Sequence, residues 1–351
     1  MTIGRDRVEG ERMSLDVVPF EGRFVEPAAA LLAADHPDGA VDLSDPAVAR
    51  RLVAAWQGTG PAVAAVDGGE LVGFLAATVQ GAPGLEDALV RNQQHAAVVG
   101  RKREVYRRLY TALAGQLTAV GRFEHTIAVS AVEGEVTTAL FELGFGIDQF
   151  KGLQSALASS GQDVRLREAR PADLRRLVEL TVELMQFHAT PPILRPALLD
   201  VPALRDGFRA ALTDDRQLIL VAEELGHVVG MMQAEPDHRH HSTAMIGIAS
   251  VCAAARSRGL GTALLAGVSA WAARQGFAHC GVGWTSANPV SDAFWRGHGF
   301  TPVACKLTRR IDPRVAWADT RLSYAHHLPD RPEVAPVPLG VQPGGDGARR
   351  S

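Results

Sequence analysis

Cysteine is scarce in this sequence of 351 residues. The three cysteines, Cys252, Cys280 and Cys305, form an odd set without a Cys-x-x-Cys pair. Such a set argues against a disulfide framework and against a thiolate zinc site. We therefore expect reduced thiols in a cytoplasmic protein and no bound metal.

A strong excess of charge is also lacking, because 36 lysines and arginines face 39 aspartates and glutamates, which gives a formal net charge of −3. This balance provides no general attraction to nucleic acid or anionic lipid. No apolar run approaches the ~20 residues that cross a membrane, and the polar first residues do not resemble a secretion signal. We expect neither nucleic acid nor membrane among the partners.

What the sequence does contain is an internal repeat. A shift of 155 positions places Gly299-Phe300 on Gly144-Phe145 without a gap. Three apolar positions spaced by four residues also coincide, as expected for the buried face of a helix. They are Leu260, Leu264 and Val268, which fall on Val105, Leu109 and Leu113. The chain therefore contains two copies of one fold.

Each copy predicts a strand, one or two helices, an antiparallel strand pair (62–78 and 218–234), a strand, a helix after a basic turn, a strand, a short helix and a closing strand. We expect an α/β fold of two tandem domains, each with a mixed, largely antiparallel sheet flanked by helices. The predicted ranges are a flexible N-terminus (1–12), a first domain (13–154), a linker (155–162), a second domain (163–327) and a disordered tail rich in proline and glycine (328–351).

A basic glycine turn in the second copy indicates an anion site. A strand ends at Val251, R-x-x-G-x-G follows from Arg256 to Gly261, and a helix continues to about Arg274. The first turn of a helix presents unpaired N–H groups and a positive dipole end to an anion. No lysine follows the glycines as in a nucleotide-binding loop, and Leu264 holds the third glycine position of a dinucleotide fingerprint.

A second motif follows at "NPVSDAFWRGHGF", which contains Asn288, Trp295 and Phe300. The two motifs in this order resemble the acyl-coenzyme A site of the GNAT superfamily of N-acyltransferases. The resemblance implies acetyl-CoA as cosubstrate, a diphosphate cradled by the glycine turn, and a pantetheine arm paired with the preceding strand. The coenzyme-binding residues that it implies are Val251, Ala253, Arg256, Arg258, Gly259, Leu260, Gly261, Thr262 and Asn288.

One departure from the family pattern lies in this second motif. Many members carry a tyrosine that is thought to protonate the departing thiolate, and this chain has Trp295 instead. An indole N–H donates a hydrogen bond but does not release a proton near neutral pH. We consider both a weakened acid role for Trp295 and a plain core aromatic.

The first copy has lost the glycine turn. Arg101 and Arg103 remain, but Glu104 and Tyr106 replace Gly259 and Gly261, and Glu133 replaces Asn288. A carboxylate repels a diphosphate, and a large ring prevents close approach to the backbone. The layout is similar to that of tandem GNAT proteins with one degenerate domain, such as mycothiol synthase.

The implied reaction is direct attack by a neutral amine, of a small molecule or a peptide, on the thioester in a ternary complex. The backbone N–H of Val251 would stabilise the oxyanion. Glu235, His188 and Ser250 are candidates for accepting or relaying the proton, and each has an alternative structural interpretation. The connection 189–214 is expected to shape acceptor choice. The histidine-rich "DHRHH" (237–241) reads as a polar turn rather than a metal site.

Two other functions remain open from the sequence. A noncatalytic acyl-CoA-binding or regulatory protein fits the missing tyrosine and the degenerate copy. An acyltransferase with a hydroxyl or thiol acceptor, or with another acyl group, keeps the same fold. The sequence is compatible with a monomer or a homodimer.

Overall fold

A computed structural model describes residues 15–35, 45–79, 88–130, 134–157, 165–195, 199–237 and 242–315. The predicted flexible N-terminus, the predicted tail and most of the predicted linker lie outside these residues. Among the described residues, no helix is long and apolar enough to cross a membrane.

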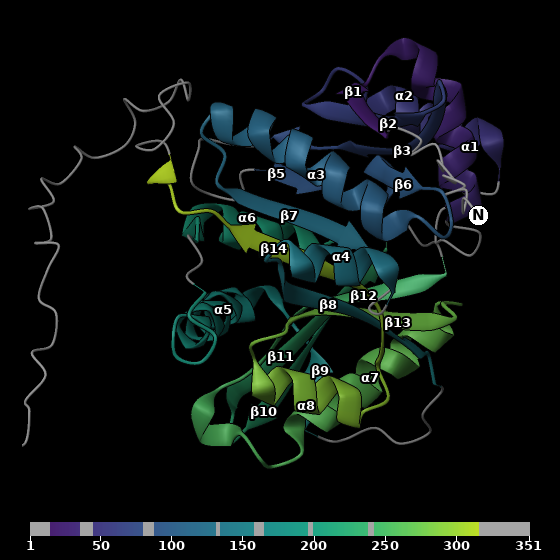
Figure 1. The fold of residues 1–351 in the computed structure, drawn as a ribbon. Coiled ribbons are helices and arrows are strands. Elements are labelled where there is room, and N and C mark those ends of the chain that lie inside the picture. Colours follow the sequence, from purple (N-terminus) through teal and green to yellow (C-terminus); the bar gives the residue numbers. More distant parts are fainter. Residues whose placement is uncertain are drawn as a thin grey trace, which may run out of the picture.

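The N-terminal half contains eight strands and four α-helices among its described residues (Figure 1). They are β1 (Asp16–Pro19), α1 (Val25–Asp35), α2 (Pro46–Trp56), β2 (Ala62–Asp67), β3 (Glu70–Ala76), β4 (Thr78–Val79), β5 (Ala88–Val90), β6 (His95–Ala97), α3 (Lys102–Ala119), β7 (Glu124–Val129), α4 (Glu135–Glu142) and β8 (Gly146–Ser155).

The C-terminal half repeats this order, with the single strand β12 in place of β4, β5 and β6. Its elements are β9 (Leu166–Glu168), α5 (Leu174–His188), α6 (Val201–Ala211), β10 (Leu218–Glu224), β11 (His227–Pro236), β12 (Thr243–Val251), α7 (Leu260–Arg274), β13 (His279–Thr285), α8 (Pro289–Gly297) and β14 (Thr301–Arg310). The α/β fold and the two strand pairs are confirmed. Helix α6 lies inside the predicted 189–214 connection, and its N-cap Asp200 accepts the Ala203 N–H at 2.9 Å, with Pro202 in the first turn.

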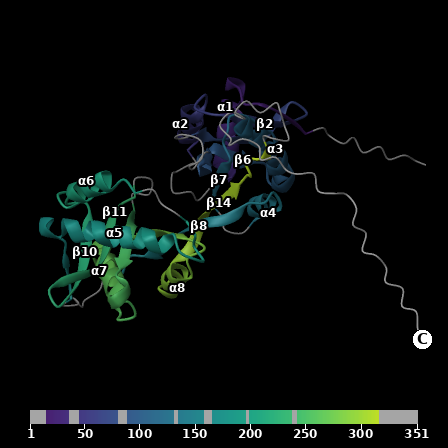
Figure 2. The same ribbon diagram turned by 90° about the vertical axis from the view of Figure 1, so that its left-hand side faces the viewer.

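The described strands form a sheet of four, in the order β1-β2-β3-β6, and a sheet of ten, in the order β4-β5-β7-β14-β8-β13-β12-β11-β10-β9. Two pairings, β5 with β7 and β12 with β13, are parallel, and the others are antiparallel. Figure 2 shows the two halves as separate lobes, with β8 and β14 between them.

The two halves exchange their last strands. Strand β8, from the first half, pairs with β13, and β14, from the second half, pairs with β7. The registers coincide under the 155-residue shift, since Glu124↔Arg310 corresponds to His279↔Ser155 (124 + 155 = 279, 310 − 155 = 155). The two strands also pair with each other through Phe150 and Cys305, which are themselves 155 positions apart. The repeat in the sequence is therefore a local two-fold symmetry of the sheet.

The predicted buried helix face is confirmed in both halves. Leu260, Leu264 and Val268 on α7 are buried against one face of β10–β13, and α3 covers the equivalent face of the N-terminal half in the same way (Figure 1). Helices α5 and α6 cover the opposite face of β10 and β11, where Ile219 and Val221 alternate with inward-facing residues of the other core. The domain boundaries predicted at residues 154 and 163 remain a prediction, because the ten-stranded sheet contains strands from both halves.

Strand β8 lies very close to the Trp284 side chain of β13 at Gly152. A Cβ atom at this position would lie 2.6 Å and 2.8 Å from two ring carbons of Trp284, which is buried on the neighbouring β13. We predict that Gly152→Ala lowers the free energy of unfolding by about 1–3 kcal/mol, because the buried ring must shift. Urea unfolding of the full chain measures this change.

Gly115→Ala is the matched control. Gly115 lies inside α3, and a Cβ atom there would meet open space, with no neighbouring atom within 4 Å. Alanine is therefore expected to raise stability by about 0.5–1 kcal/mol through helix propensity. If Gly152→Ala has the same free energy of unfolding as the wild type, the packing of β8 against β13 described here is contradicted.

Candidate functional site

The central strands of the C-terminal half separate toward their carboxyl ends. Strand β12 pairs with β13 over Thr243–Ile246, whereas no β13 partner pairs with residues 247–251 in the described register. On its other side β12 remains paired with β11 up to Val251. The last residues of β12 therefore offer one backbone edge that can pair with an extended ligand.

The register shows which backbone groups face this opening. The Cys252 N–H donates to the Val229 carbonyl at 2.8 Å, which makes 229 and 252 a hydrogen-bonded pair. Val251, opposite Gly230, then belongs to a non-hydrogen-bonded pair, so its N–H and C=O point away from β11. The predicted oxyanion donor thus faces the β13 side.

Helix α7 begins at Leu260, after the short 3-10 turn (Ala253–Ala255) and the basic loop that follow this strand, and no side chain caps its N-terminus. Its N-cap, Gly259, adopts φ +76° with open space around the Cβ position, and Ser257 adopts φ +63°. The first-turn residues Leu260, Gly261 and Thr262 present N–H groups that have no carbonyl partner within the helix. These amides and the helix dipole fit a diphosphate, as the resemblance implies.

The predicted arginines lie beside the turn but are engaged by the protein. The Arg256 Nε donates to the Val251 carbonyl at 3.0 Å, and its guanidinium lies 4.9 Å from the centre of the Phe187 ring. Arg258 pairs with Glu224 at 2.9 Å and donates to the Ala254 carbonyl. Both side chains therefore hold the loop in shape, and Ala253 lies exposed in the short 3-10 turn before it.

Gly261 has a packing reason that the sequence did not reveal. A Cβ atom there would lie 3.2 Å from the Phe294 ring on α8, so glycine allows α8 to approach the start of α7. His298 makes a second link: its Nδ1 donates to the Phe294 carbonyl at 2.7 Å, which leaves Nε2 to accept from the Thr262 hydroxyl at 2.9 Å. Sequence reasoning missed Phe294 and His298, since neither belongs to the glycine motif.

Asn288 and Trp295 lie at α8. Asn288 is 4% exposed and caps the helix, because its Oδ1 accepts the Ser291 N–H at 3.1 Å. Trp295 is also 4% exposed, packs edge-on against Phe300, and donates its indole N–H to the Ser291 hydroxyl at 2.9 Å. Its position matches that of a core aromatic with a satisfied polar group.

The three candidate proton acceptors lie on different elements. Ser250, on β12, is buried and donates its hydroxyl proton to the Leu180 carbonyl of α5 at 3.2 Å. His188, the last residue of α5, is half-buried, and desolvation together with nearby Arg195 lowers its imidazole pKa. Glu235, on β11, is half-buried with no ion pair to a described residue. The structure therefore brings Ser250 and His188 to the α5 side of β12.

The corresponding opening in the N-terminal half is closed from inside. Strand β6 pairs with β3 and not with β7 among the described residues, yet His95 bridges the gap by donating from Nε2 to the Ala128 carbonyl at 2.8 Å. Its Nδ1 accepts from the hydroxyl of Tyr106, which is fully buried at the position equivalent to Gly261. Two buried side chains thus fill the gap that corresponds to the opening between β12 and β13.

The basic turn of the N-terminal half is neutralised as well. Arg101 pairs with Asp67 and Glu104, and Arg103 pairs with Glu142. Hydrogen bonds from Arg103 lower the pKa of the Glu142 carboxyl. The equivalent of Asn288, Glu133, lies outside the described residues.

No group of three or more histidine, cysteine, aspartate or glutamate side chains within the described ranges could hold a metal ion. Of the histidine-rich stretch 237–241, only Asp237 is described; it is buried and pairs with Lys151 of β8 at 2.9 Å. The three cysteines are free thiols.

Comparisons with known proteins agree with this geometry. The family model for the acetyltransferase (GNAT) family matches residues 182–300, from the second half of α5 to the residue before β14. No curated protein sequence matches the chain.

Solved structures share the fold at low sequence identity. A GCN5-related N-acetyltransferase from Sphaerobacter thermophilus has a TM-score of 0.58 and 15% identity, over 85% of this chain and 96% of that chain. A tandem GNAT protein from the clavulanic acid biosynthesis pathway has a TM-score of 0.50 and 16% identity, over 85% of this chain and 98% of that one. Residues 182–300 thus match the GNAT acetyltransferase family, whose members use acetyl-CoA as acyl donor. The solved structures share the fold of this chain.

Proposed function

We propose that this chain is an N-acetyltransferase that transfers the acetyl group of acetyl-CoA to a small-molecule or peptide amine. The reaction takes place in the C-terminal half, at the opening between β12 and β13. The observation that carries the proposal is the uncapped N-terminus of α7, which is the next α-helix after β12, together with the end of β12 (residues 247–251) that β13 leaves unpaired. The free cysteines fit a reducing compartment, and we place the enzyme in the cytoplasm.

The chain's own groups can hold both reactants side by side. The N–H groups of Leu260, Gly261 and Thr262 bind the diphosphate, and the edge of β12 that β13 leaves unpaired contacts the pantetheine arm. Acetyl-CoA supplies the thioester. The Val251 N–H, directed away from β11, donates to the oxygen that gains charge as the amine attacks in a ternary complex.

Proton transfer favours His188 as the base. Its lowered pKa keeps the imidazole neutral near pH 7, so that it can accept a proton from the ammonium form of the acceptor and free the amine to attack. Ser250, whose oxygen keeps lone pairs free while its proton is donated to Leu180, is suited to a relay through water. Trp295 has no acid role in this proposal, because its N–H is held by Ser291. A thiol of pKa ~8.5 is a tolerable leaving group without one.

A matched pair of variants tests the diphosphate site. Aspartate and asparagine have nearly the same shape, and both tolerate the left-handed conformation of Gly259. Gly259→Asp places a negative charge at the diphosphate, so we predict that it binds acetyl-CoA at least about tenfold more weakly than Gly259→Asn. Calorimetric titration of the full chain measures both affinities.

The difference between the two variants should shrink as salt screens the charge. If the two variants bind acetyl-CoA with equal affinity at low ionic strength, the diphosphate does not bind at the N-terminus of α7. Acetyl-CoA binding by the wild type, without thiol release over polyamines, amino sugars, amino acids and peptides, would instead favour a binding protein over an enzyme.

The pH dependence tests His188. Since the folded-state pKa is lowered, kcat/KM should fall as pH drops through a value below the ordinary ~6.5 of histidine. We predict that His188→Gln lowers kcat/KM at pH 7 by about 10²-fold or more and removes this acidic limb. Free-thiol release from acetyl-CoA, followed from pH 5 to 8, measures both.

Folding stability provides an independent readout of the same pKa. Below pH ~6.5 the unfolded chain binds more protons at His188 than the folded chain, so stability contributed by the neutral imidazole is lost as pH falls. The His188→Gln variant should lose less stability between pH 7 and pH 5 than the wild type. A variant with unchanged kcat/KM and an intact acidic limb would exclude His188 as the base.

A further inference from the structure

Helix α5 leads past the end of β12 to the proposed transfer site. The Leu180 carbonyl, in the middle of the helix, accepts from the Ser250 hydroxyl at 3.2 Å. Near the end of the helix, the centre of the Phe187 ring lies 4.9 Å from the guanidinium of Arg256, which follows β12. The last residue of α5, the proposed base His188, therefore lies close to the end of β12.

The chain reverses its direction in the turn 189–195, directly after the helix. The Arg195 N–H donates to the His188 carbonyl at 2.8 Å, so the turn closes on the residue that precedes it. Leu194 adopts φ +50°, which is unfavourable for a residue with a Cβ atom, and its side chain is 64% exposed. Such a conformation persists where neighbouring interactions hold it. The contacts of Arg195 are therefore important for the shape of the turn.

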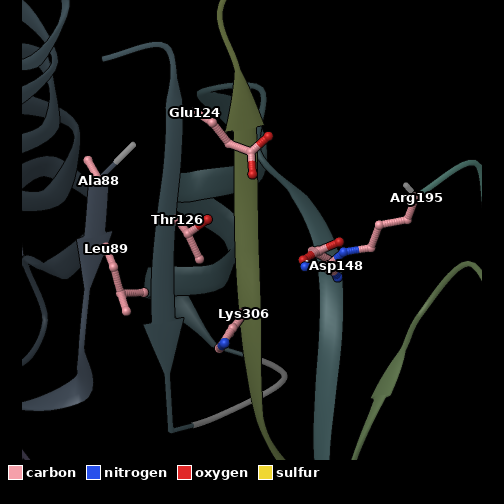
Figure 3. A pocket seen from close by; sticks show the side chains of 7 residues that line it. All are labelled: Ala88, Leu89, Glu124, Thr126, Asp148, Arg195 and Lys306. Atoms are coloured by element: carbon pink, nitrogen blue, oxygen red, sulfur yellow. Dashed lines mark ion pairs between the residues drawn. The ribbon is translucent and has the colours of Figure 1, made fainter. Parts of the chain in front are cut away.

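Arg195 anchors this turn to strand β8, which belongs to the first half. Its Nη1 lies 2.8 Å from a carboxylate oxygen of Asp148, and the two side chains are only 26% and 18% exposed (Figure 3). Water and salt screen such a pair less than a surface pair. Both side chains line a polar pocket at the junction of the two halves, together with Glu124, Thr126 and Lys306.

The backbone at Asp148 is fixed to the opposite side of the opening. Asp148 is the extra residue of a β-bulge, because its two neighbours on β8 face consecutive residues of β14. Its carbonyl accepts the N–H of Ser286, directly after β13, at 2.9 Å. The Ser286 hydroxyl also donates to the Ile147 carbonyl. The anchor of the turn is thus held to β13, whereas α5 itself contacts β12.

The bulge does not need an acidic residue for its own sake. Under the shift of 155 positions, Asp148 corresponds to Val303, which is the extra residue of the equivalent bulge in β14. The Val303 side chain is 37% exposed, and that bulge forms with an apolar residue. The carboxylate of Asp148 is therefore an addition to the symmetric scaffold, and it lies where the turn after α5 approaches β8.

We infer that the ion pair of Arg195 with Asp148 positions His188 for proton transfer, so that a strand of the first half supports the chemistry of the second. The pair holds Arg195, whose N–H holds the His188 carbonyl. Desolvation and the charge of Arg195 together lower the His188 pKa, and Arg256 is a second cation near this end of α5. The inference rests on the proposed role of His188, whereas the contacts themselves do not.

Variants of Arg195 test its effect on His188. In Arg195→Gln the acidic limb of kcat/KM should move to higher pH, toward the ordinary ~6.5 of histidine, because only desolvation still lowers the pKa. Arg195→Lys keeps the charge and should leave the limb close to its wild-type position. NMR titration of the His188 imidazole in the free chain measures the same shift without turnover. An unchanged His188 pKa in Arg195→Gln would overturn the inference.

Asp148→Asn tests the anchor, since asparagine has nearly the same shape as aspartate but no charge. We expect kcat/KM to fall about tenfold or more, because small displacements of a catalytic group are costly. Hydrogen exchange at the Arg195 amide should become faster, because the turn 189–195 is held less firmly. Affinity for acetyl-CoA should be unchanged, since Asp148 lies on β8 and not at α7. Wild-type kcat/KM together with wild-type exchange would contradict the role of the anchor.

A second ion pair of β8 provides the matched control. Lys151 pairs with Asp237, directly after β11, at 2.9 Å and with 29% and 8% exposure. Lys151→Gln should leave the His188 pKa and the exchange of the Arg195 amide as in the wild type. Equal changes in Lys151→Gln and Asp148→Asn would indicate general loosening of the junction and would overturn the inference.

The double variant Asp148→Asn/Arg195→Gln shows whether the two residues act as one unit. Its loss of kcat/KM should be no larger than that of the more damaged single variant, because each substitution breaks the same pair. Losses that multiply would mean independent roles, against the inference.

The two proposals fail in different ways. A chain with the predicted changes in the His188 pKa and in amide exchange, but without thiol release from acetyl-CoA, would keep the positioning and lose the proposed function. A chain that acetylates amines while Arg195→Gln and Asp148→Asn behave as the wild type would keep the function and lose the positioning.

Discussion

The reciprocal exchange of β8 and β14 is the constraint on which the rest of the molecule depends. Each half leaves its last strand in the sheet of the other, so neither central strand, β7 or β13, is paired on that side by its own copy. The close contact of Gly152 with Trp284 lies within this exchanged pairing. The sheet of each half is therefore complete only when the other half contributes its last strand.

The first copy keeps the fold of the second and fills its own opening with side chains. His95 occupies the position equivalent to Ser250 and bridges to β7, and Tyr106 replaces Gly261 and supports it. Burying two polar side chains is costly unless their hydrogen bonds are satisfied, and here both are. The closed opening is thus a stable core in place of a cleft, which suits a domain that contributes packing and strands.

Much of this was readable from the sequence, because periodicity and motif spacing report local structure. The repeat, the buried stripe of Leu260 and Leu264, and the basic turn before α7 were all predicted. The strand exchange was not, because copies related by a constant shift offer the same pairing partners within one half or between the two. The sequence explains Gly261 by close approach of a phosphate alone, whereas a Cβ atom there would also crowd the Phe294 ring. Such a contact between distant residues leaves no local pattern.

The exchange also explains why some polar groups can be read from the sequence and others cannot. The proposed groups for the acyl donor, from Val251 to Thr262, come from one continuous stretch of the second half, so a sequence motif reveals them. The polar pocket at the junction instead combines Asp148, a bulged residue of β8, with Arg195 and with Lys306 of β14 (Figure 3). These residues are far apart in sequence, and they meet because β8 and β14 lie side by side. Such a cluster leaves no local pattern in the sequence, so only the structure shows it.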